Sequence, residues 1–324
     1  MINKCEKPIG IDISQSSVKA VCLDMNNSVD SYGIVDLPVN AGDTEIILAL
    51  KKAISADCYN CDAIIGLRGL DVLTKQVTLQ NITNVDEMAK AAEEHILDIL
   101  PVERSEVELS WEVVSQENNE IKVILIAVPK KVLERYQRIV DGVGLHIKSF
   151  EINALALYRS FMDEISRNTL LVDIHADETN IEFYDQKLLL IDKTISKGGV
   201  NITREISRRH NISMQEAEKI KRQNQIENED DFKQLYRPTA DDLINEIEKV
   251  ATMINFEYKR DINLILLTGG DFNLSDFNEY FVEKVSHLAS TRVMVPRAVM
   301  VSDNIDKKLS DKLRLANAVG LALK

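Results

Sequence analysis

The sequence predicts an α/β fold made of two copies of one unit, with a smaller unit inserted into the first copy. The main observation is that "IGIDISQSSVKAVCLD" at residues 9–24 is repeated in outline by "LVDIHADETNIEFYD" at 171–185. In each stretch an apolar run ends in Asp-Ile, a polar turn follows, and alternating apolar residues continue to a second Asp twelve positions after the first. Helical and strand periodicities alternate along the chain, which excludes a purely α-helical or all-β protein.

Both copies have the same predicted order of elements. In the first copy, alternation predicts strands at 8–14, 17–24 and 29–37, helical spacing runs from Thr44 to Ala56, and a fourth strand covers 62–67. In the second copy, the matching strands lie near 168–174, 179–185 and 187–195. Helices follow, and then the apolar strand "NLILLTGG" ends at 270. This βββαβ order predicts two RNase H-like cores.

Residues 72–150 have a different pattern and predict the inserted unit. The segment "VLTKQVTLQ" is typical of a strand, and "NVDEMAKAAEEHILDIL" carries apolar residues on one face of a helix. Two strands follow, "VELSWEVVSQ" and "EIKVILIAVP", and then a helix from Lys130 to Val143 and a strand at 146–151. We therefore expect a β-α-β-β-α-β subdomain.

The rest of the chain is predicted to be mostly helical beside the second core. Helical patterns cover Asn201–His210, Ser213–Gln225 and Ala240–Tyr258, and the Ala- and Gly-rich "KLRLANAVGLALK" predicts a closely packed last helix. The expected division is a first core at 1–71, the insert at 72–150, a linking helix at 151–167, the second core at 168–200, a helical subdomain at 201–262, the second core continued at 263–311, and a terminal helix at 312–324 that returns to the first domain.

Composition and charge narrow the class of protein. Of the 324 residues, 45% are hydrophobic, enough for a sizeable core, and the longest apolar runs are far shorter than the ~20 residues of a membrane-spanning helix. The first ten residues contain no apolar signal-peptide region, so we expect a soluble cytoplasmic protein. The net charge of −13 argues against nucleic acid or anionic lipid as a partner.

The repeated hairpin suits a nucleotide held between two similar domains. Its turns would direct backbone N–H groups at phosphates, and Asp12 and Asp173 would face a magnesium ion or its waters from opposite walls. Gly269-Gly270 follows a strand and would let the backbone approach an adenosine, and Gly198-Gly199 precedes a helix that could approach phosphates. Each feature alone is more often a tight turn or a helix cap than a ligand contact. Their order along the chain favours the nucleotide site.

The same features resemble the actin-like ATPase superfamily, and within it the PilM family of type IV pilus assembly proteins, related to the cell-division protein FtsA. The resemblance covers nearly the whole chain. It includes, among the possible family members, the branch that serves mannose-sensitive haemagglutinin pili. It rests on these stretches: "GIDISQSSVKAV", "VLTKQVTL", "ILPVERSEVELSWEVV", "VILIAVPKKVLERYQRIVDGVGL", "FEINALALYRSF", "LVDI", "GGVNITREISRRHNISMQEAEKIKR", "LILLTGGDF" and "ANAVGLALK".

The resemblance implies an ATP and Mg²⁺ site. The positions that it implies are Asp12, Ser14, Ser16, Ser17 and Lys19 in the first phosphate loop, Asp173 and Thr179 in the second, Gly198 and Gly199 near the phosphates, Gly269 and Gly270 near the adenosine, and Glu218 and Lys221 near ribose and adenine, with Asp12 and Asp173 toward the metal. An exposed i,i+3 salt bridge is the alternative for Glu218 and Lys221.

The chain departs from the family in both phosphate loops. Ser14 and His175 stand where the family has glycine, and a positive φ there would cost either residue on the order of 1 kcal/mol. Asp177 and Glu178 would repel a triphosphate by a few kcal/mol unless they turn outward or hold metal. We therefore expect a weakened or lost nucleotide site. His175, Asp177 and Glu178 could instead form a new metal or catalytic site. The other interpretation of this cluster is a β-turn whose polar side chains are simply solvated.

The family resemblance implies an interaction protein. PilM proteins bind the N-terminal cytoplasmic peptide of PilN, an inner-membrane protein, in a groove that involves the first domain and its insert. Other pilus platform proteins are expected partners. One alternative is an active ATPase or a small-molecule kinase. However, no residue is identified that would activate water, and "IIGLRG" at 64–69 supplies no base. Another is an FtsA-like filament former, which would carry a C-terminal amphipathic anchor.

The four cysteines are Cys5, Cys22, Cys58 and Cys61. They lack the distributed pattern that staples a small secreted fold, so we expect reduced thiols. Cys58 and Cys61 have CxxC spacing, which could serve redox exchange or supply half of a zinc site. Because the chain has no second CxxC pair, we interpret these cysteines as incidental thiols.

Overall fold

The computed structural model describes residues 7–324 apart from 60, 81, 83–84, 98–102, 118–119, 187, 224–228 and 303–308. The first domain is built on a five-stranded sheet with the order β3-β2-β1-β4-β8. Its strands are β1 (Ile9–Ile13), β2 (Ser17–Leu23), β3 (Val29–Asp36), β4 (Asp62–Leu67) and β8 (His146–Ile152). Helix α1 (Asp43–Ala53) and the short 3-10 helix η1 (Ala56–Cys58) connect β3 to β4.

The second domain repeats this sheet strand for strand. Its order is β11-β10-β9-β12-β13, from β9 (Thr169–Ile174), β10 (Thr179–Asp185), β11 (Leu188–Ile195), β12 (Leu264–Thr268) and β13 (Ser290–Val293). In both sheets the first three strands are antiparallel and the last two are parallel to the first strand of the hairpin. The register is the same too, because Asp12 lies opposite Lys19 and Asp173 lies opposite Asn180. The predicted duplication is confirmed.

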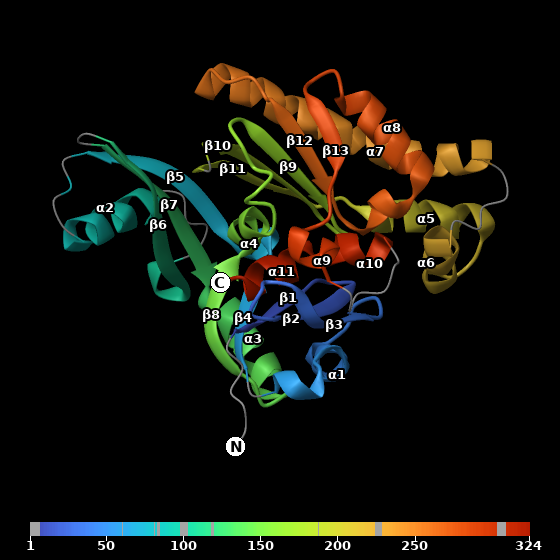
Figure 1. Ribbon diagram of the computed structural model, residues 1–324, viewed down its shortest axis with the longest axis horizontal. Helices are drawn as coiled ribbons and strands as arrows, with labels where there is room; N and C mark the ends of the chain where they lie inside the picture. Colours follow the sequence, from blue (N-terminus) through green and yellow to red (C-terminus); the bar gives the residue numbers. More distant parts are fainter. Residues whose placement is uncertain are drawn as a thin grey trace.

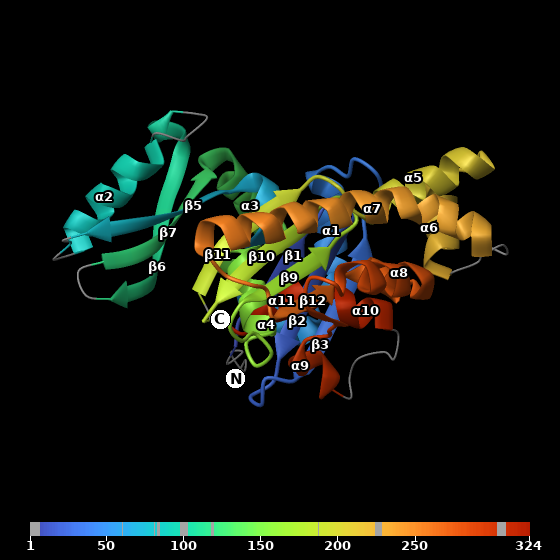
Figure 2. The same cartoon turned by 90° about the horizontal axis from the view of Figure 1, so that it is seen from above.

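The inserted subdomain projects from one side of the molecule, as Figures 1 and 2 show. Its three-stranded antiparallel sheet has the order β5-β7-β6, with β5 (Leu73–Gln80), β6 (Val107–Glu117) and β7 (Glu120–Pro129), and α2 (Val85–Leu97) packs on one face. The short 3-10 helices η2 (Gly69–Asp71) and η3 (Arg104–Glu106) precede β5 and β6. Helix α3 (Lys130–Asp141) contributes to the core beneath the first sheet, and β8 pairs with β4, so the end of the predicted β-α-β-β-α-β unit is shared with the first domain.

Helices surround the second sheet and occupy the boundary between the domains. Helices α5 (Gly199–His210) and α6 (Met214–Gln223) lie at the end opposite the insert, and the long α7 (Glu229–Met253) continues into a π-helical turn at Ile254–Tyr258 (Figure 2). The remaining helices are α4 (Asn153–Ser160), η5 (Gly270–Asn273), α8 (Ser275–Val285), α9 (Arg297–Met300), α10 (Leu309–Arg314) and α11 (Ala316–Ala322). Among the described residues, no helix combines the length and apolar character needed to cross a membrane.

The last helix, α11, lies between the two sheets, and all of its residues are buried. Its small side chains are required there. A Cβ on Gly320 would lie 1.8 Å from the carbonyl oxygen of Ala156 in α4, and a Cβ on Gly10 in β1 would lie 2.0 Å from the carbonyl oxygen of Ala318. This direct backbone packing positions Asn317 between the hairpins of the two domains.

Candidate functional site between the two domains

The two hairpin turns have the same backbone geometry. The Ser14 N–H donates to the Ser17 carbonyl at 2.9 Å, and the His175 N–H donates to the Glu178 carbonyl at 2.9 Å. Neither Ser14 nor His175 has a positive φ, so the conformational cost considered for these two side chains does not arise. The difference between the turns lies in their side chains: Ser14 Oγ stays within its own turn and bonds to Ser17, whereas His175 reaches out of its turn.

In the first domain, Asp12 forms a buried ion pair with Lys19. The distance from Lys19 Nζ to Asp12 Oδ2 is 2.6 Å, and both side chains are almost fully inaccessible. Burial alone would raise the pKa of Asp12, but the charges of Lys19 and His175 outweigh it and lower that pKa. Asp12 is therefore held as a carboxylate that already has a cation bound to it.

In the second domain, the partner of Asp173 is His175. The distance from His175 Nε2 to Asp173 Oδ2 is 2.8 Å, and Asn317 on α11 donates to the same carboxylate oxygen at 3.1 Å. Burial alone would lower the pKa of His175, but the adjacent Asp173 raises it to about 9. His175 is thus a protonated imidazolium at neutral pH, and it occupies the carboxylate that the sequence had suggested for Mg²⁺.

Arg68 links the two domains through the second turn. Its Nη2 lies 2.5 Å from Asp177 Oδ2 and 2.9 Å from Glu178 Oε2. The pKa of Arg68 is raised because these two carboxylates outweigh the effect of its burial. The expected repulsion from Asp177 and Glu178 is therefore replaced by an ion pair. Sequence reasoning missed Arg68, although it is the one charged side chain in "AIIGLRG".

The amides after Gly198 are already bonded within the protein. The Gly199 N–H donates to the His175 carbonyl at 3.0 Å, and the Val200 N–H donates to the Ala176 carbonyl at 2.7 Å. A Cβ on Gly198 would lie 2.1 Å from the His175 carbonyl oxygen. These glycines therefore serve the close packing of the start of α5 against the second turn.

The predicted pair Glu218 and Lys221 does form, but Lys221 is buried, so the alternative of an exposed salt bridge is wrong for it. Lys221 Nζ lies 3.1 Å from Glu218 Oε2 and 2.9 Å from Asp271 Oδ1, and it donates to the Gly199 carbonyl at 3.1 Å. Burial would lower the pKa of Lys221, but Asp271 and Glu218 raise it. The lysine thus ties together two of the predicted glycine motifs.

The remaining predicted positions also make internal contacts. Thr179 Oγ1 donates to the Lys197 carbonyl at 2.8 Å, and Ser16 Oγ lies 3.4 Å from Ser14 Oγ. Gly269 adopts φ of 112°, and a Cβ there would lie 2.1 Å from the Ile174 carbonyl oxygen, which explains this glycine without a ligand. A Cβ on its neighbour Gly270 would lie 3.0 Å from Cγ of Arg314.

A second set of ion pairs joins the domains at the end of β3. Asp36 lies 2.5 Å from Arg222 of α6 and 2.5 Å from Arg314 of α10. Burial would raise the pKa of Asp36, but the two arginines lower it. The two domains are therefore connected by three kinds of contact: Arg68 with the second turn, Asn317 with Asp173, and these arginines with Asp36.

The donor set does not fit a Mg²⁺-triphosphate. Asp12 and Asp173, the two candidate metal ligands, are neutralised by Lys19 and His175, and the amides of Gly199 and Val200 are used by carbonyls. Asp177 and Glu178 share a single cation, Arg68, so the second turn offers a triphosphate no free positive charge. A nucleotide would have to displace these contacts, so we derive no chemical step through it.

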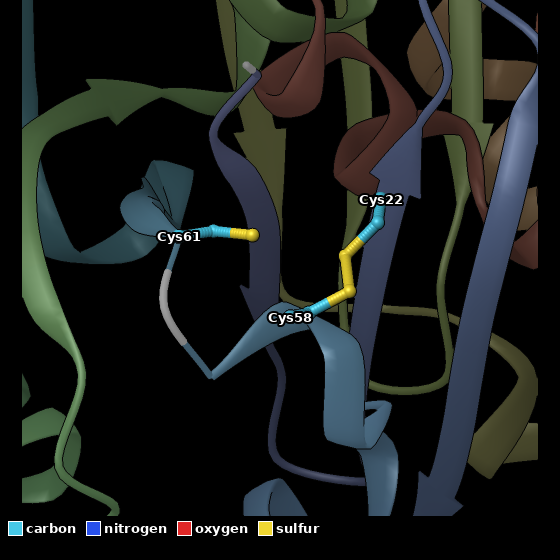
Figure 3. A group of neighbouring side chains, drawn as sticks. All are labelled: Cys22, Cys58 and Cys61. Atoms are coloured by element: carbon cyan, nitrogen blue, oxygen red, sulfur yellow. A yellow bond between two sulfur atoms is a disulfide. The ribbon is translucent and has the colours of Figure 1, made fainter. Parts of the chain in front are cut away.

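The alternative of a metal or catalytic cluster at His175, Asp177 and Glu178 is also not supported. His175 turns to Asp173, and the other two turn to Arg68. Within the described part of the chain, the only group of three or more candidate metal ligands is Cys22, Cys58 and Cys61. Cys22 and Cys58 are joined by a disulfide, so the expectation of reduced thiols is wrong for this structure (Figure 3). Cys5 lies outside the described residues.

Comparison with known proteins identifies one family and two relatives. The family model for the type IV pilus assembly protein PilM matches residues 10–324. The chain is 23% identical over 259 residues to the cell division protein FtsA of Bacillus subtilis, covering 68% of this chain and 59% of FtsA. It is 22% identical to FtsA of Enterococcus hirae, covering 66% of this chain and 56% of FtsA. The chain thus spans less than two thirds of the length of these relatives.

Solved structures show the same fold. A chain of a PilM-PilN type IV pilus biogenesis complex has a TM-score of 0.82 at 19% identity, covering 98% of both chains. The ethanolamine utilization protein EutJ from Carboxydothermus hydrogenoformans has a TM-score of 0.61 at 14% identity, covering 100% of this chain and 92% of EutJ. The archaeal actin homolog Ta0583 has a TM-score of 0.52 at 12% identity, covering 98% of both. The predicted actin-like fold is confirmed.

Proposed function

The chain belongs to the family of the type IV pilus assembly protein PilM, and from this premise we propose that it is a cytoplasmic docking protein of a pilus assembly platform. Its partner would be the short N-terminal cytoplasmic peptide of a PilN-like inner-membrane protein, which would hold it at the membrane. Other platform proteins would bind through this complex. A solved PilM-PilN complex with the same fold supports this choice of partner.

The observation that carries the proposal is a pocket of mixed polarity at the junction of the insert with the two domains. Its volume is about 120 Å³, close to the ~150 Å³ cavity that holds a benzene ring in another protein. The pocket can thus receive one bulky apolar side chain. It is lined by Glu112 and Val113 of β6, Leu155 and Tyr158 of α4, and Tyr184, Leu188 and Leu189 of the β10–β11 hairpin.

The strand beside this pocket offers a backbone for an extended peptide. Strand β6 is an edge of its sheet, and among the described strands none pairs with its outer side. An unpaired edge can accept a peptide as an additional strand, with alternate side chains directed into a pocket. Val113, an apolar residue that is 45% exposed, lies on this edge. A peptide along β6 would cover it.

The charge near the pocket selects a basic partner. Glu108 and Glu112 are both exposed on β6. They are four residues apart, so their side chains lie on the same face of the strand. The pKa of Glu112 is raised, first by desolvation of its carboxyl group and then by the charge of Glu151. Lys324 and Arg159 act in the opposite direction, but the pKa stays raised. The two exposed glutamates therefore favour a peptide that combines a bulky apolar side chain with a lysine, an arginine or a free amino terminus.

The nucleotide region supports a scaffold instead of an ATPase. The positions that would bind phosphate and metal form internal ion pairs and hydrogen bonds, and several of these pairs fix one domain against the other. In this proposal the ancestral site has become a connection between domains, which keeps the surface around the insert rigid for docking.

The test is binding of a fluorescent synthetic peptide with the N-terminal cytoplasmic sequence of the membrane protein encoded beside this chain. We expect saturable binding by the full chain, weakened at least tenfold by Val113→Asp, since a buried carboxylate in the interface costs well over 1.4 kcal/mol. Met25→Asp is the matched control, because Met25 is 67% exposed and lies on the β2–β3 turn of the first domain. Equal binding by both variants, or none by the wild type, would reject the proposal.

A further inference from the structure

Three cysteine sulfur atoms converge at one end of the first-domain sheet. The sulfurs of Cys22, Cys58 and Cys61 all lie within 4.8 Å of one another (Figure 3). They come from three places in the fold, namely near the end of β2, the last residue of η1, and the residue before β4. Cys58 and Cys61 are 3% and 4% exposed, and Cys22 is partly buried. The cluster therefore joins the β2 strand to the turn between η1 and β4.

The backbone presents Cys58 and Cys61 as a chelating pair. The Cys58 N–H donates to the Ser55 carbonyl at 3.0 Å, and the Cys61 N–H donates to the Cys58 carbonyl at 3.1 Å, so the two residues sit at the ends of one tight turn. Two cysteines at this spacing are a typical half of a zinc site. Ser31 lies opposite Cys22 on β3, and its hydroxyl is 3.4 Å from Cys58 Sγ, where it can support a ligand from outside the coordination sphere.

We propose that the reduced cluster binds one Zn²⁺ through the thiolates of Cys22, Cys58 and Cys61. Zinc–sulfur bonds of ~2.3 Å in a tetrahedral site place the sulfurs about 3.8 Å apart, which fits within the observed 4.8 Å. Each thiol loses a proton on binding, and no group is oxidised or reduced. The inference rests on the proposed function because it requires a cytoplasmic location, where cysteine thiols are kept reduced.

The disulfide in the structure is the oxidised form of the same cluster. Cys22 and Cys58 are joined with a Cα–Cα distance of 6.9 Å, and no described cysteine is a free thiol. A disulfide uses sulfurs two at a time, whereas a metal ion uses all three at once. Oxidation and zinc binding therefore exclude each other, and the redox state of the sample decides between them.

The site lies at the other end of the β1–β2 pair from Asp12 and would have a structural role. Gly10 at the start of β1 lies opposite Val21, next to Cys22, whereas Asp12 near its end lies opposite Lys19. Ile9 lies beside Ala63, two residues after Cys61. The metal would thus link Cys58 and Cys61, which lie between α1 and β4, to Cys22 on the β1–β2 hairpin. We do not assign the fourth ligand, and Cys5 remains unchanged in every variant below.

The test uses the full chain purified without oxygen and with a thiol-free reductant. We expect about one Zn²⁺ per chain by elemental analysis, and thiolate-to-metal charge-transfer absorption after Co²⁺ replaces Zn²⁺. Both signals should be lost in Cys58→Ser and Cys61→Ser. Ser31→Ala should weaken Zn²⁺ binding about tenfold or more, in a competition with a coloured chelator. His146→Gln is the control, since His146 pairs with Asp62 beside Cys61 but is not in the cluster.

Two results would overturn the inference. One is a fully reduced wild-type chain without stoichiometric Zn²⁺, and the other is Zn²⁺ retained by both Cys58→Ser and Cys61→Ser. If a serine variant does not fold, the wild-type chain is tested instead by removing Zn²⁺ with a chelator and then adding it back. A bound structural metal predicts that the melting temperature falls on removal and recovers on addition. Peptide binding is measured on the same samples, so a failure of the zinc site and a failure of the docking function are seen separately.

Discussion

Arg68 Nη2 lies 2.9 Å from Glu178 Oε2, and this ion pair joins the end of β4 in the first domain to the second hairpin turn. Both side chains are buried. Removing one partner of a buried pair leaves the other charge without compensation, which typically costs about 3–5 kcal/mol. The pair is therefore a sensitive probe of how the two domains are held together.

Arg68→Leu should lower the free energy of unfolding by about 3 kcal/mol or more in urea denaturation, because Glu178 is left buried and unpaired. The double variant Arg68→Leu, Glu178→Leu should recover only part of that loss, because Asp177, the other partner of Arg68, still lacks its cation. Arg208→Gln is the control, since its i,i+3 pair with Glu205 is on the surface, and no measurable change is expected. Equal effects of Arg68→Leu and Arg208→Gln would contradict the assigned role of the Arg68 pair.

His175 should make stability depend on pH at alkaline values. Its pKa in the folded protein is about 9, above the ordinary value near 6.5, so its pairing with Asp173 stabilises the fold fully below about pH 6.5. This stabilisation is lost as the pH rises through 9, and its size is on the order of 3 kcal/mol, since each tenfold change in proton affinity corresponds to about 1.4 kcal/mol.

The measurement is the free energy of unfolding at pH 6.5 and pH 9.5. The difference between the two should be larger in the wild type than in His175→Gln. His146→Gln, at a histidine whose side chain is 80% exposed, should keep the wild-type difference. A wild type and His175→Gln with parallel pH profiles would show that the imidazolium does not hold Asp173.

These two contacts also show what the sequence could and could not predict. The duplicated fold was predictable because strand alternation, Asp-Ile endings and turns are local signals that recur in the same order in both halves of the chain. The partners of the predicted site residues were not, because Arg68 and Glu178 are 110 positions apart, and Asn317 and Asp173 are 144 positions apart. Only the packing of α11 and of the two sheets determines which of these side chains meet.

Local sequence patterns also could not predict how deeply a charged side chain is buried. The spacing of Glu218 and Lys221 predicted their pair, but an exposed and a buried i,i+3 pair have the same spacing. Lys221 is buried because Asp271, far along the chain, packs over it. Backbone strain does not arise at Ser14 or His175. The Ser14 hydroxyl bonds within its own turn, whereas His175 acts through its ion pair with Asp173.

Mg²⁺-ATP should not bind stoichiometrically to the wild-type chain in isothermal titration calorimetry. The physical reason is that Lys19 and His175 compensate Asp12 and Asp173, and the amides of Gly199 and Val200 are already bonded. Binding of the partner peptide by the same sample is the positive control for a folded protein. Tight binding of Mg²⁺-ATP would show that these internal contacts open readily, and it would restore the ATPase alternative.

The packing of α11 gives the last prediction. A Cβ on Gly320 would lie 1.8 Å from the Ala156 carbonyl oxygen, so Gly320→Ala must push α11 away from α4 and should destabilise the fold by about 1–3 kcal/mol or more. Gly144→Ala is the matched control, because Gly144 has φ of +78° but no atom within 4 Å of an added Cβ, so only backbone strain of about 1 kcal/mol is expected. Because α11 carries Asn317 to Asp173, Gly320→Ala should also reduce the alkaline loss of stability that His175 causes, whereas Gly144→Ala should not. A Gly320→Ala protein as stable as the wild type, with an unchanged pH profile, would show that α11 does not position these residues.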